Sequence, residues 1–559
     1  MASAPVSDEH LLCRVSVLKQ FNHELVGVLP FADLAEGVQV SGQAESRTFC
    51  WGGSSKHRGL AVGGGEHPTR GLGPLLVHLR RSMFLATKQQ TLAQAVRITT
   101  THAKKAEDEY DYPEDLPQVT VNRLKAAAGQ ESTDADVRLR TSVFHQLFQE
   151  LHNVDASLLR MGYTHPMDDG QLRTFKVKFE GEGVDDYGGP YREIFTQVAA
   201  ELTSAVSTSS QTGKAAERTV AGVASPDEGV GREYLLSVLE PVPSSASGDG
   251  DVDVEFMVNA DVRPQRQLRT YQFLGQLMGV ALRCRVAVPW RLSQIFWKGL
   301  VGETLQEADL AHVDSTAHAF VQSIRARLTE LKTENPEVDQ FTRGSDVLTW
   351  TATARGSTVV ELRPGGGELA VEASDLSPYA RGVAQARLHQ GDMALFAVRD
   401  GFASVVPTAV LPLFTWDEVE LQVCGRPGVD IDLLQANTEY DEDISCSDAH
   451  IQSFWRVLRA FDDRDRSQFL RFVWARSRLP CKGVDFHQKF KIHSPTGEGA
   501  KEDPDRFLPK AHTCFFSINL PRYSSDEIMA NKLSYTMYNC IEMDADFRLA
   551  DNEMPGWEN

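Results

Sequence analysis

The last quarter of the chain carries the clearest alternation of apolar and polar positions. Five apolar residues recur at the spacing of one helix face: Ile451, Phe454, Trp455, Leu458 and Phe461. A shorter group of the same kind predicts a second helix, which Pro480 closes: Phe469, Phe472 and Val473. The two patterns predict a pair of amphipathic helices that bury one face each.

A strand and a final helix are expected after this pair. Apolar residues on one face alternate with Phe515, Ser517 and Asn519 until Pro521 ends the run: Cys514, Phe516, Ile518 and Leu520. Ser524 and Glu527 have capping-box spacing and predict a helix start. The buried face of that helix would be Met529, Leu533, Met537 and Cys540. The end of the chain therefore predicts a small α+β domain with a cysteine at the edge of a strand.

Patterning is weaker upstream. Residues 1–160 contain three features in order: a helical start (Leu11, Leu12, Val15, Leu18), a Gly- and Ser-rich stretch over 52–73 and a charged connector from Lys104. A second helix follows at Phe144, Leu147, Phe148 and Leu151. Polar segments from Ser204, Pro243 and Lys491 are predicted loop insertions. The turn residues Gly425, Arg426, Pro427 and Gly428 predict a hinge at 425–429.

Composition narrows the function classes. The length of 559 residues predicts several domains. The net charge of −20 and the pI near 5.3 argue against a nucleic-acid site, because such a site needs a basic surface. No two of the eight cysteines are spaced as C-x-x-C, so a structural zinc site is not expected, and no cofactor is predicted. The absence of a signal peptide or a long apolar stretch predicts a cytoplasmic or nuclear protein without membrane insertion.

Cys514 is the candidate nucleophile, in the segment LPKAHTCFF. A thiol at the start of a strand, after a polar loop, can be accessible, and His512 can stabilise its thiolate. A cysteine beside two phenylalanines is nonetheless more often a small buried apolar residue. A Cys–His pair would also suit a cysteine protease, although no third orienting group stands at a recognisable spacing. A glycine-rich segment lacks the lysine of a phosphate-binding loop and is interpreted as a strand-to-helix turn. Its glycines are Gly181, Gly183, Gly188 and Gly189.

The wider context around Cys514 resembles the HECT ubiquitin ligases. The catalytic segment of that family is similar to LPKAHTCFFSINLPRYSS, which begins at Leu508. Other segments of this chain resemble further landmarks of the family and occur in the same order. They are KVKFEGEGVDDYGGPYREIF, YQFLGQLMGVAL, VLTWTATARGSTVVELRPGGGELAV, DGFASVVP, LFTWDEVELQVCG, NTEY and FWRVLRAFDDRDRSQFLRFVWARSRLP. The resemblance covers about residues 161–559.

This resemblance implies an α+β fold of two lobes: a large, mostly helical lobe (161–424), the hinge (425–429) and a small α+β lobe (430–559), after an N-terminal extension (1–160). It implies that a ubiquitin-conjugating enzyme docks between about Leu310 and Trp350. Cys514 then accepts ubiquitin as a thioester, and a lysine of a protein substrate displaces it. Arg478 would position the ubiquitin tail, and His512 and Thr513 would shape the surroundings of the thiol.

Some features leave alternatives open. A catalytically inactive binding module for ubiquitin or the conjugating enzyme would keep the same fold, although the intact Thr-Cys-Phe at 513–515 favours an active ligase. The aromatic residue that the family often needs near its C-terminus would be Phe547 or Trp557. Residues 1–160 are interpreted as the lead-in of a giant HECT ligase.

Overall fold

The computed structural model describes most of the chain in several stretches: 8–29, 72–104, 111–166, 170–182, 186, 188–206, 234–243, 254–259, 265–331, 342–343, 346–353, 359–426, 428–476, 478–479, 486, 488–495, 499, 502–513 and 515–539. They fall into two compact units. The first combines Met1–Thr99, Val238–Gly275 and Arg291–Val419, and the second combines Thr100–Ser237, Gln276–Trp290 and Glu420–Asn559.

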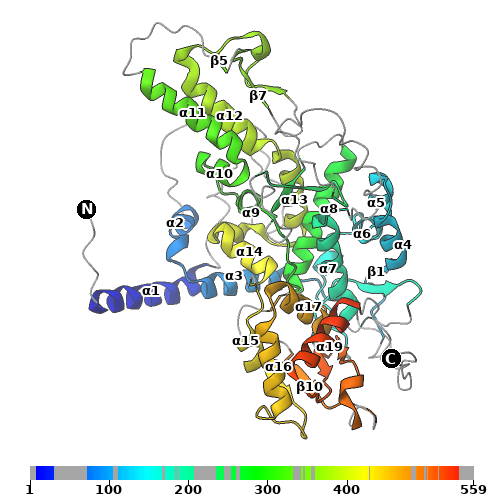
Figure 1. The fold of residues 1–559 in the computed structure, drawn as a ribbon. Helices are drawn as coiled ribbons and strands as arrows, with labels where there is room; N and C mark the ends of the chain where they lie inside the picture. Colours follow the sequence, from blue (N-terminus) through cyan, green and yellow to red (C-terminus); the bar gives the residue numbers. More distant parts are fainter. Residues whose placement is uncertain are drawn as a thin grey trace. The chain divides into compact units, whose positions relative to one another are not determined.

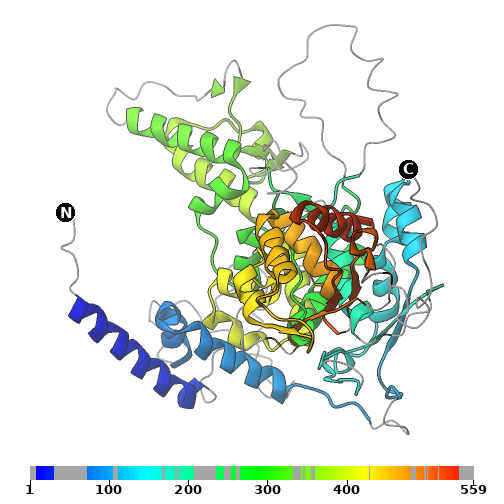
Figure 2. The same cartoon turned by 60° about the horizontal axis from the view of Figure 1, so that its bottom comes forward.

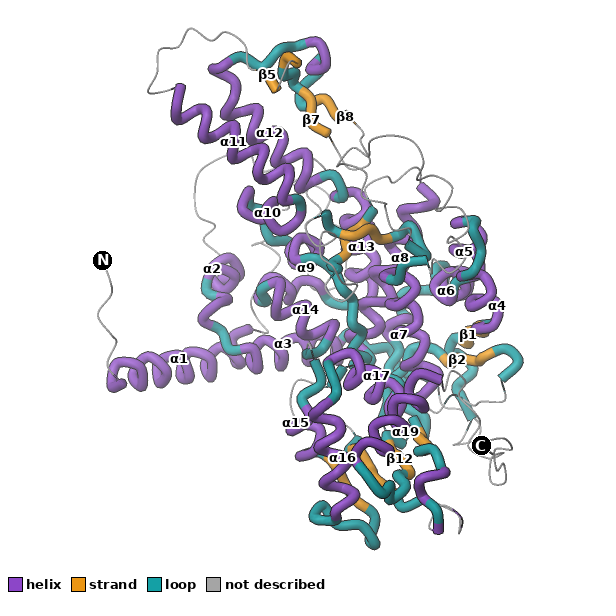
Figure 3. The backbone as a smooth tube through the Cα atoms, in the orientation of Figure 1, coloured by secondary structure: helices purple, strands orange, loops and turns teal. Residues whose placement is uncertain are grey.

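Helices dominate both units, and the strands are short (Figure 3). This agrees with the predicted α+β class. The division into lobes at 425–429 stays a prediction.

The first unit is mainly helical. Its elements are α1 (Asp8–Val28), α2 (Leu72–His78), η3 (Arg80–Ser82), α3 (Leu85–Ile98), β3 (Leu239–Pro241), β4 (Phe256–Val258), the start of α8 (Gln265–Arg283), α9 (Gln294–Val301), η6 (Glu307–Asp309), α10 (Leu310–Val313), α11 (Ser315–Leu331), β5 (Thr342–Arg343), β6 (Asp346–Val347), β7 (Thr351–Thr353), β8 (Val359–Glu361), η8 (Gly366–Glu368), η9 (Ala373–Asp375), α12 (Leu376–His389), α13 (Asp392–Val405), η10 (Thr408–Leu413) and the start of α14 (Trp416–Cys424). The expected N-terminal helix is α1, and its Leu11, Leu12 and Val15 are exposed.

The segment from Leu310 to His389 forms a sub-lobe of this unit. Its long helices α11 and α12 pack side by side, next to the hairpins β5–β6 and β7–β8 (Figure 1). The antiparallel pair β7–β8 lies in the segment VLTWTATARGSTVVELRPGGGELAV, which resembles a landmark of the family. Its buried core includes Leu310, Val321, Ile324, Trp350, Leu376, Tyr379 and Val383. The same core also contains Val242, Met257 and Ile295 from outside this segment.

The second unit begins with elements that surround a parallel strand pair. They are β1 (Gln118–Val121), α4 (Arg123–Gln130), α5 (Ala135–Thr141), α6 (Val143–Leu151), η4 (Leu158–Arg160), β2 (Lys176–Phe179) and α7 (Gly189–Thr203). The helix predicted at Phe144 is α6, and the Ser142 side chain caps its N-terminus. The buried Glu201 carboxylate also accepts the backbone N–H groups of Val143 and Phe144, at 2.9 and 3.0 Å. Desolvation raises the pKa of Glu201 to about 7.

The glycine-rich segment between β2 and α7 turns around Asp186. The Asp186 carboxylate accepts the backbone N–H groups of Val177, Gly188 and Tyr191, and it pairs with Arg173 at 3.0 Å. The backbone donors that a phosphate would need are therefore occupied by a side chain of this protein. This agrees with the interpretation of the glycines as a strand-to-helix turn.

The remainder of the second unit is an α+β module, called the C-terminal module below. After the end of α14 its elements are α15 (Ile431–Ala436), β9 (Thr438–Tyr440), α16 (Ala449–Ala460), α17 (Asp463–Trp474), β10 (Phe490–His493), η12 (Pro504–Arg506), β11 (Lys510–His512), β12 (Ser517–Asn519) and α19 (Asp526–Asn539). The sheet has the order β11-β12-β10-β9, with β12–β10 and β10–β9 parallel and β11–β12 antiparallel. α19 packs against α16 and α17 (Figure 2).

The predicted helix pair forms the core of this module. Ile451, Phe454, Trp455 and Leu458 of α16 are buried, as are Phe469 and Val473 of α17. However, α17 ends at Trp474, where Ala475 adopts φ +54°, and not at Pro480. Pro480 itself lies outside the described residues.

Two further details correct the predictions from the sequence. The last helix begins at Asp526, and Ser525 rather than Ser524 accepts from the Ile528 N–H; the Ser524 hydroxyl donates to Asp505 instead. The loop predicted to start at Lys491 begins later, because Lys491 lies within strand β10. Most of the Ser204 and Pro243 loops, together with Pro427, Cys540, Phe547 and Trp557, lie outside the described residues.

Within the described stretches, no helix is long and apolar enough to cross a membrane.

Candidate active site

The cysteine turn, residues 513–516, connects β11 to β12. Cys514 lies outside the described residues, whereas Thr513, Phe515 and Phe516 are described. The antiparallel pair His512–Ser517 closes the turn, and the Phe515 N–H donates to the His512 carbonyl at 3.0 Å. Phe515 is 50% exposed, and Thr513 and His512 are half-buried. The residues on both sides of Cys514 therefore reach the protein surface.

This turn corrects the predicted strand. Strand β12 begins at Ser517, so Phe515 and Phe516 belong to the turn and not to the strand. The predicted inward positions are nevertheless correct for Phe516, Ile518 and Leu520, which are all buried. The pattern identified the buried face but not the point at which the backbone turns.

Phe516 anchors the cysteine turn in the core. Its φ of +45° is uncommon for a bulky residue, and its side chain is fully buried. The ring stacks on Trp474 with centroids 4.0 Å apart and an interplanar angle of 9°, and it lies 5.1 Å from Phe490. Trp474 also stacks on Phe486 at 5.8 Å. These aromatic contacts offset the cost of the left-handed backbone.

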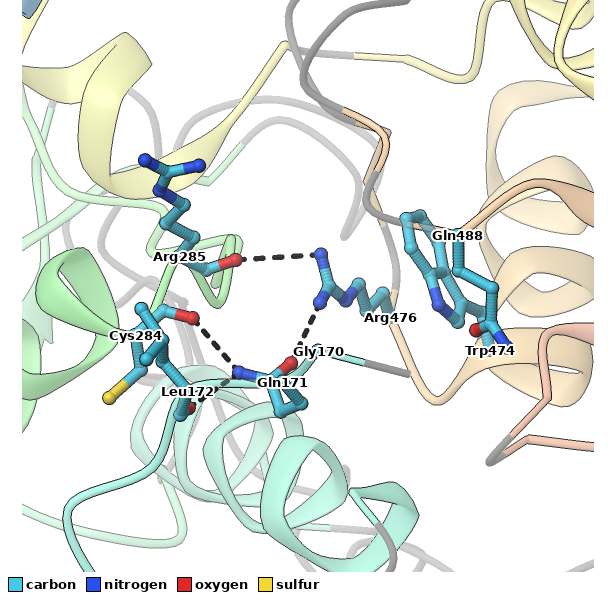
Figure 4. A pocket seen from close by; sticks show the side chains of 8 residues that line it. All are labelled: Gly170, Gln171, Leu172, Cys284, Arg285, Trp474, Arg476 and Gln488. Atoms are coloured by element: carbon cyan, nitrogen blue, oxygen red, sulfur yellow. Dashed lines mark hydrogen bonds between the residues drawn. The ribbon is translucent and has the colours of Figure 1, made fainter. Parts of the chain in front are cut away.

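A second set of contacts surrounds Gln171, on the segment before β2 (Figure 4). The side-chain amide of Gln171 donates to the carbonyls of Cys284, at 2.9 Å, and Leu172, at 2.7 Å. Its oxygen accepts from Arg476 at 2.8 Å, and Arg476 also donates to the Arg285 carbonyl at 3.4 Å. The Arg476 guanidinium lies 4.2 Å from the Trp474 ring centroid. The small pocket beside these groups, with a volume of about 40 Å³, has space for a few water molecules at most.

Arg192, in the first turn of α7, reaches the cysteine turn itself. Its Nη2 donates to the Thr513 carbonyl at 2.8 Å, and its Nη1 donates to the Gln171 oxygen at 3.4 Å. Its side chain is fully buried. Sequence reasoning missed this contact, which joins residues 321 positions apart.

The structure places Arg478 beside the predicted hinge. Its Nη1 donates to the carbonyls of Cys424, at 3.4 Å, and Gly425, at 3.3 Å. Gly425 and Gly428 adopt φ of +72° and +75°, which favours glycine. The predicted role of Arg478 toward ubiquitin stays a prediction.

The described cysteines differ in burial. Burial raises the pKa of Cys284 to about 11 and that of Cys424 to about 12, so neither forms a thiolate at neutral pH. Cys13 and Cys446 are exposed. Among the described residues, no group of three or more His, Cys, Asp or Glu side chains is placed to hold a metal ion.

Comparison with known proteins identifies the family. The family described as HECT-domain (ubiquitin-transferase) matches residues 240–546, which is more than half of the chain. Human E3 ubiquitin-protein ligase HERC2 is 30% identical over 433 residues, and mouse E3 ubiquitin-protein ligase HUWE1 is 27% identical over 480 residues.

These matches cover 77% and 82% of this chain but only 8% and 9% of the two relatives. The chain therefore corresponds to a small part of very large proteins. Because the family match includes the cysteine turn and more than half of the sequence, the chain belongs to the HECT-domain ubiquitin-transferase family.

Proposed function

We propose that this chain is the catalytic part of a ubiquitin-protein ligase that carries ubiquitin as a thioester on Cys514. The observation that carries the proposal is the cysteine turn, which lies within the HECT match and has the half-exposed Phe515 beside the cysteine. By contrast, Cys284 and Cys424 are sealed in the core.

The reaction needs two acyl transfers. The Cys514 thiolate attacks the carbonyl carbon of the conjugating enzyme's thioester; a new C–S bond forms, and the enzyme's thiolate leaves. A substrate lysine amine then attacks the new thioester; an amide bond forms, the amine loses a proton, and the Cys514 thiolate leaves. An ordinary cysteine with a pKa near 8.5 is a few per cent ionised at neutral pH, which suffices for such exchange.

The remaining roles follow from the family. The conjugating enzyme docks between about Leu310 and Trp350 in the sub-lobe, where Val359, Val360 and Leu369 expose apolar surface. Arg478 positions the ubiquitin tail, and His512 and Thr513 shape the surroundings of the thiol. Ubiquitin, a conjugating enzyme and a protein substrate are the proposed partners. The glycine-containing segment 425–429 lets one thiol meet two different partners in turn.

A thioester assay tests this function. The chain is incubated with activating enzyme, a panel of conjugating enzymes, ATP and ubiquitin, and is then run on non-reducing and reducing gels. A thiol-sensitive ubiquitin adduct is expected in the wild type and in the controls Cys13→Ala and Cys446→Ala, which remove exposed thiols. Cys514→Ala should form none, and Cys514→Ser should form a thiol-resistant ester.

Two outcomes would contradict the proposal. An adduct that persists in Cys514→Ala would place the thioester on another cysteine. Binding of charged conjugating enzyme without any adduct would instead support the catalytically inactive binding module.

A further inference from the structure

The contact between Arg192 and the cysteine turn has a direct chemical consequence. The Arg192 guanidinium donates to the carbonyl of Thr513, the residue to which Cys514 is covalently attached. A hydrogen bond from a charged donor is shorter and stronger than one between neutral groups. It therefore restricts the orientation of the Thr513 carbonyl, immediately before the thiol-bearing residue in the sequence.

Arg192 is held so that it can make this contact. Burying a guanidinium costs less when its donors are hydrogen-bonded, and Gln171 supplies an acceptor for Nη1 at 3.4 Å beside the Thr513 carbonyl that accepts from Nη2. Gly188, at φ +101°, caps α7 just before Arg192. A Cβ at this position would lie 3.1 Å from the Arg192 Nη1, so the glycine also leaves room for the guanidinium.

Gln171 links Arg192 to the other side of the turn. Its two donated hydrogen bonds, to Cys284 and Leu172, leave its oxygen facing Arg476 (Figure 4). The same oxygen accepts from Arg192. Arg476 covers Trp474, on which Phe516 stacks. The cysteine turn is thus fixed at Thr513 by a charged hydrogen bond and at Phe516 by stacking.

We propose that Arg192 is a positioning residue for the thioester chemistry: it fixes the cysteine turn through the Thr513 carbonyl, with Gln171 holding its guanidinium in place. The inference rests on the proposed function of Cys514. Arg192 touches neither ubiquitin nor the reacting atoms in this role. Its effect is on how often the thiol is presented in a reactive geometry.

The ion pair of Arg471 with Glu193 provides a matched control. Glu193 is the next residue of α7, and Arg471 lies on α17, so this pair also joins α7 to the C-terminal module. The side-chain hydrogen bonds of Arg471 go to Glu193 and not to the described residues of the cysteine turn. Arg471→Gln therefore weakens another contact between α7 and the C-terminal module without removing a donor to Thr513.

Two measurements on the full chain test the proposal. In single-turnover transfer from a charged conjugating enzyme, Arg192→Gln should lower the rate constant at saturation at least fivefold. The half-saturating enzyme concentration and the reaction amplitude should stay unchanged, since a partly unfolded variant would lose amplitude instead. Arg192→Lys, which restores one charged donor, should recover part of the rate, and Arg471→Gln should react like the wild type.

The second measurement does not depend on ubiquitin. Hydrogen–deuterium exchange of the peptide covering 510–519 should become faster in Arg192→Gln but not in Arg471→Gln. Unchanged exchange and unchanged transfer in Arg192→Gln would refute the positioning role, as would equal slowing in both variants. If the wild type forms no adduct at all, the proposed function fails, and the exchange comparison still decides whether Arg192 orders the turn.

Discussion

The left-handed backbone of Phe516 predicts an inversion of the usual order of stability between alanine and glycine variants. Phe516 is fully buried at φ +45°, and Phe490 of strand β10, also fully buried, contacts it from the neighbouring strand. Replacing either phenylalanine with alanine or glycine removes a core aromatic ring. The comparison of the two replacements at each site isolates the contribution of the backbone.

The magnitudes follow from ring loss and backbone conformation. Phe→Ala in a core costs about 3–5 kcal/mol. Glycine normally costs a further 0.5–1 kcal/mol or so relative to alanine, because its unfolded chain is more flexible. An L-residue in the left-handed region costs about 1–2 kcal/mol, which glycine avoids. Phe516→Gly should therefore be more stable than Phe516→Ala by about 0.5–1 kcal/mol, whereas Phe490→Gly should be less stable than Phe490→Ala by about the same amount.

Equilibrium urea titrations of the four variants, followed by near-ultraviolet circular dichroism, measure these differences. The informative quantity is the change in sign between the two sites, because the loss of the ring cancels within each pair. If Phe516→Gly proves less stable than Phe516→Ala, as at Phe490, the turn does not hold residue 516 in the left-handed region, and the account of the cysteine turn is wrong.

Two more predictions concern a buried acid and the hinge glycines. Because burial raises the pKa of Glu201 from 4.5 to about 7, folding favours its protonated form, and its contribution to stability falls as the pH rises from about 4.5 to 7. As the pH rises from 5 to 7.5, the Tm of Glu201→Gln in thermal melts should therefore fall less than the Tm of the wild type. An equal fall in both proteins would contradict the raised pKa of Glu201. Gly425→Ala should cost more stability than Gly428→Ala. Both have positive φ, but a Cβ at Gly425 meets the Ala287 Cβ at 3.0 Å and the Leu479 carbonyl at 3.3 Å, whereas a Cβ at Gly428 meets the Asp463 Oδ1 at an ordinary contact distance of 3.9 Å. Urea titrations of both variants check the order, and equal losses would show that the contacts of Gly425 relax without cost.

The sequence predicted those parts of the C-terminal module that depend on periodicity. The stripe of α16 and the inward positions of β12 follow from side-chain spacing alone, and the structure buries them as expected. The backbone reversal at Phe516 was missed, because aromatic residues rarely adopt positive φ and neither glycine nor asparagine marks the turn.

The groups around the cysteine turn were missed for a different reason. Arg192 lies in the segment YREIF, where it looks like an ordinary helix residue, and no local pattern connects it to Thr513. The same holds for Gln171, whose partners come from three separate stretches of the chain. Such contacts depend on tertiary packing, which single-sequence periodicity does not contain.

The order of the strands also determines when the C-terminal module can fold during synthesis. β10 pairs with β9 on one side, but its other neighbour, β12, is made later and separates it from β11. Until β12 emerges from the ribosome, β10 keeps an open edge, and Phe490 and Ile492 lack the cover of Phe516 and Ile518. A chain that stops before β12, through premature termination or proteolysis, exposes an unpaired strand with apolar side chains and is expected to aggregate rather than persist as a folded, inactive protein.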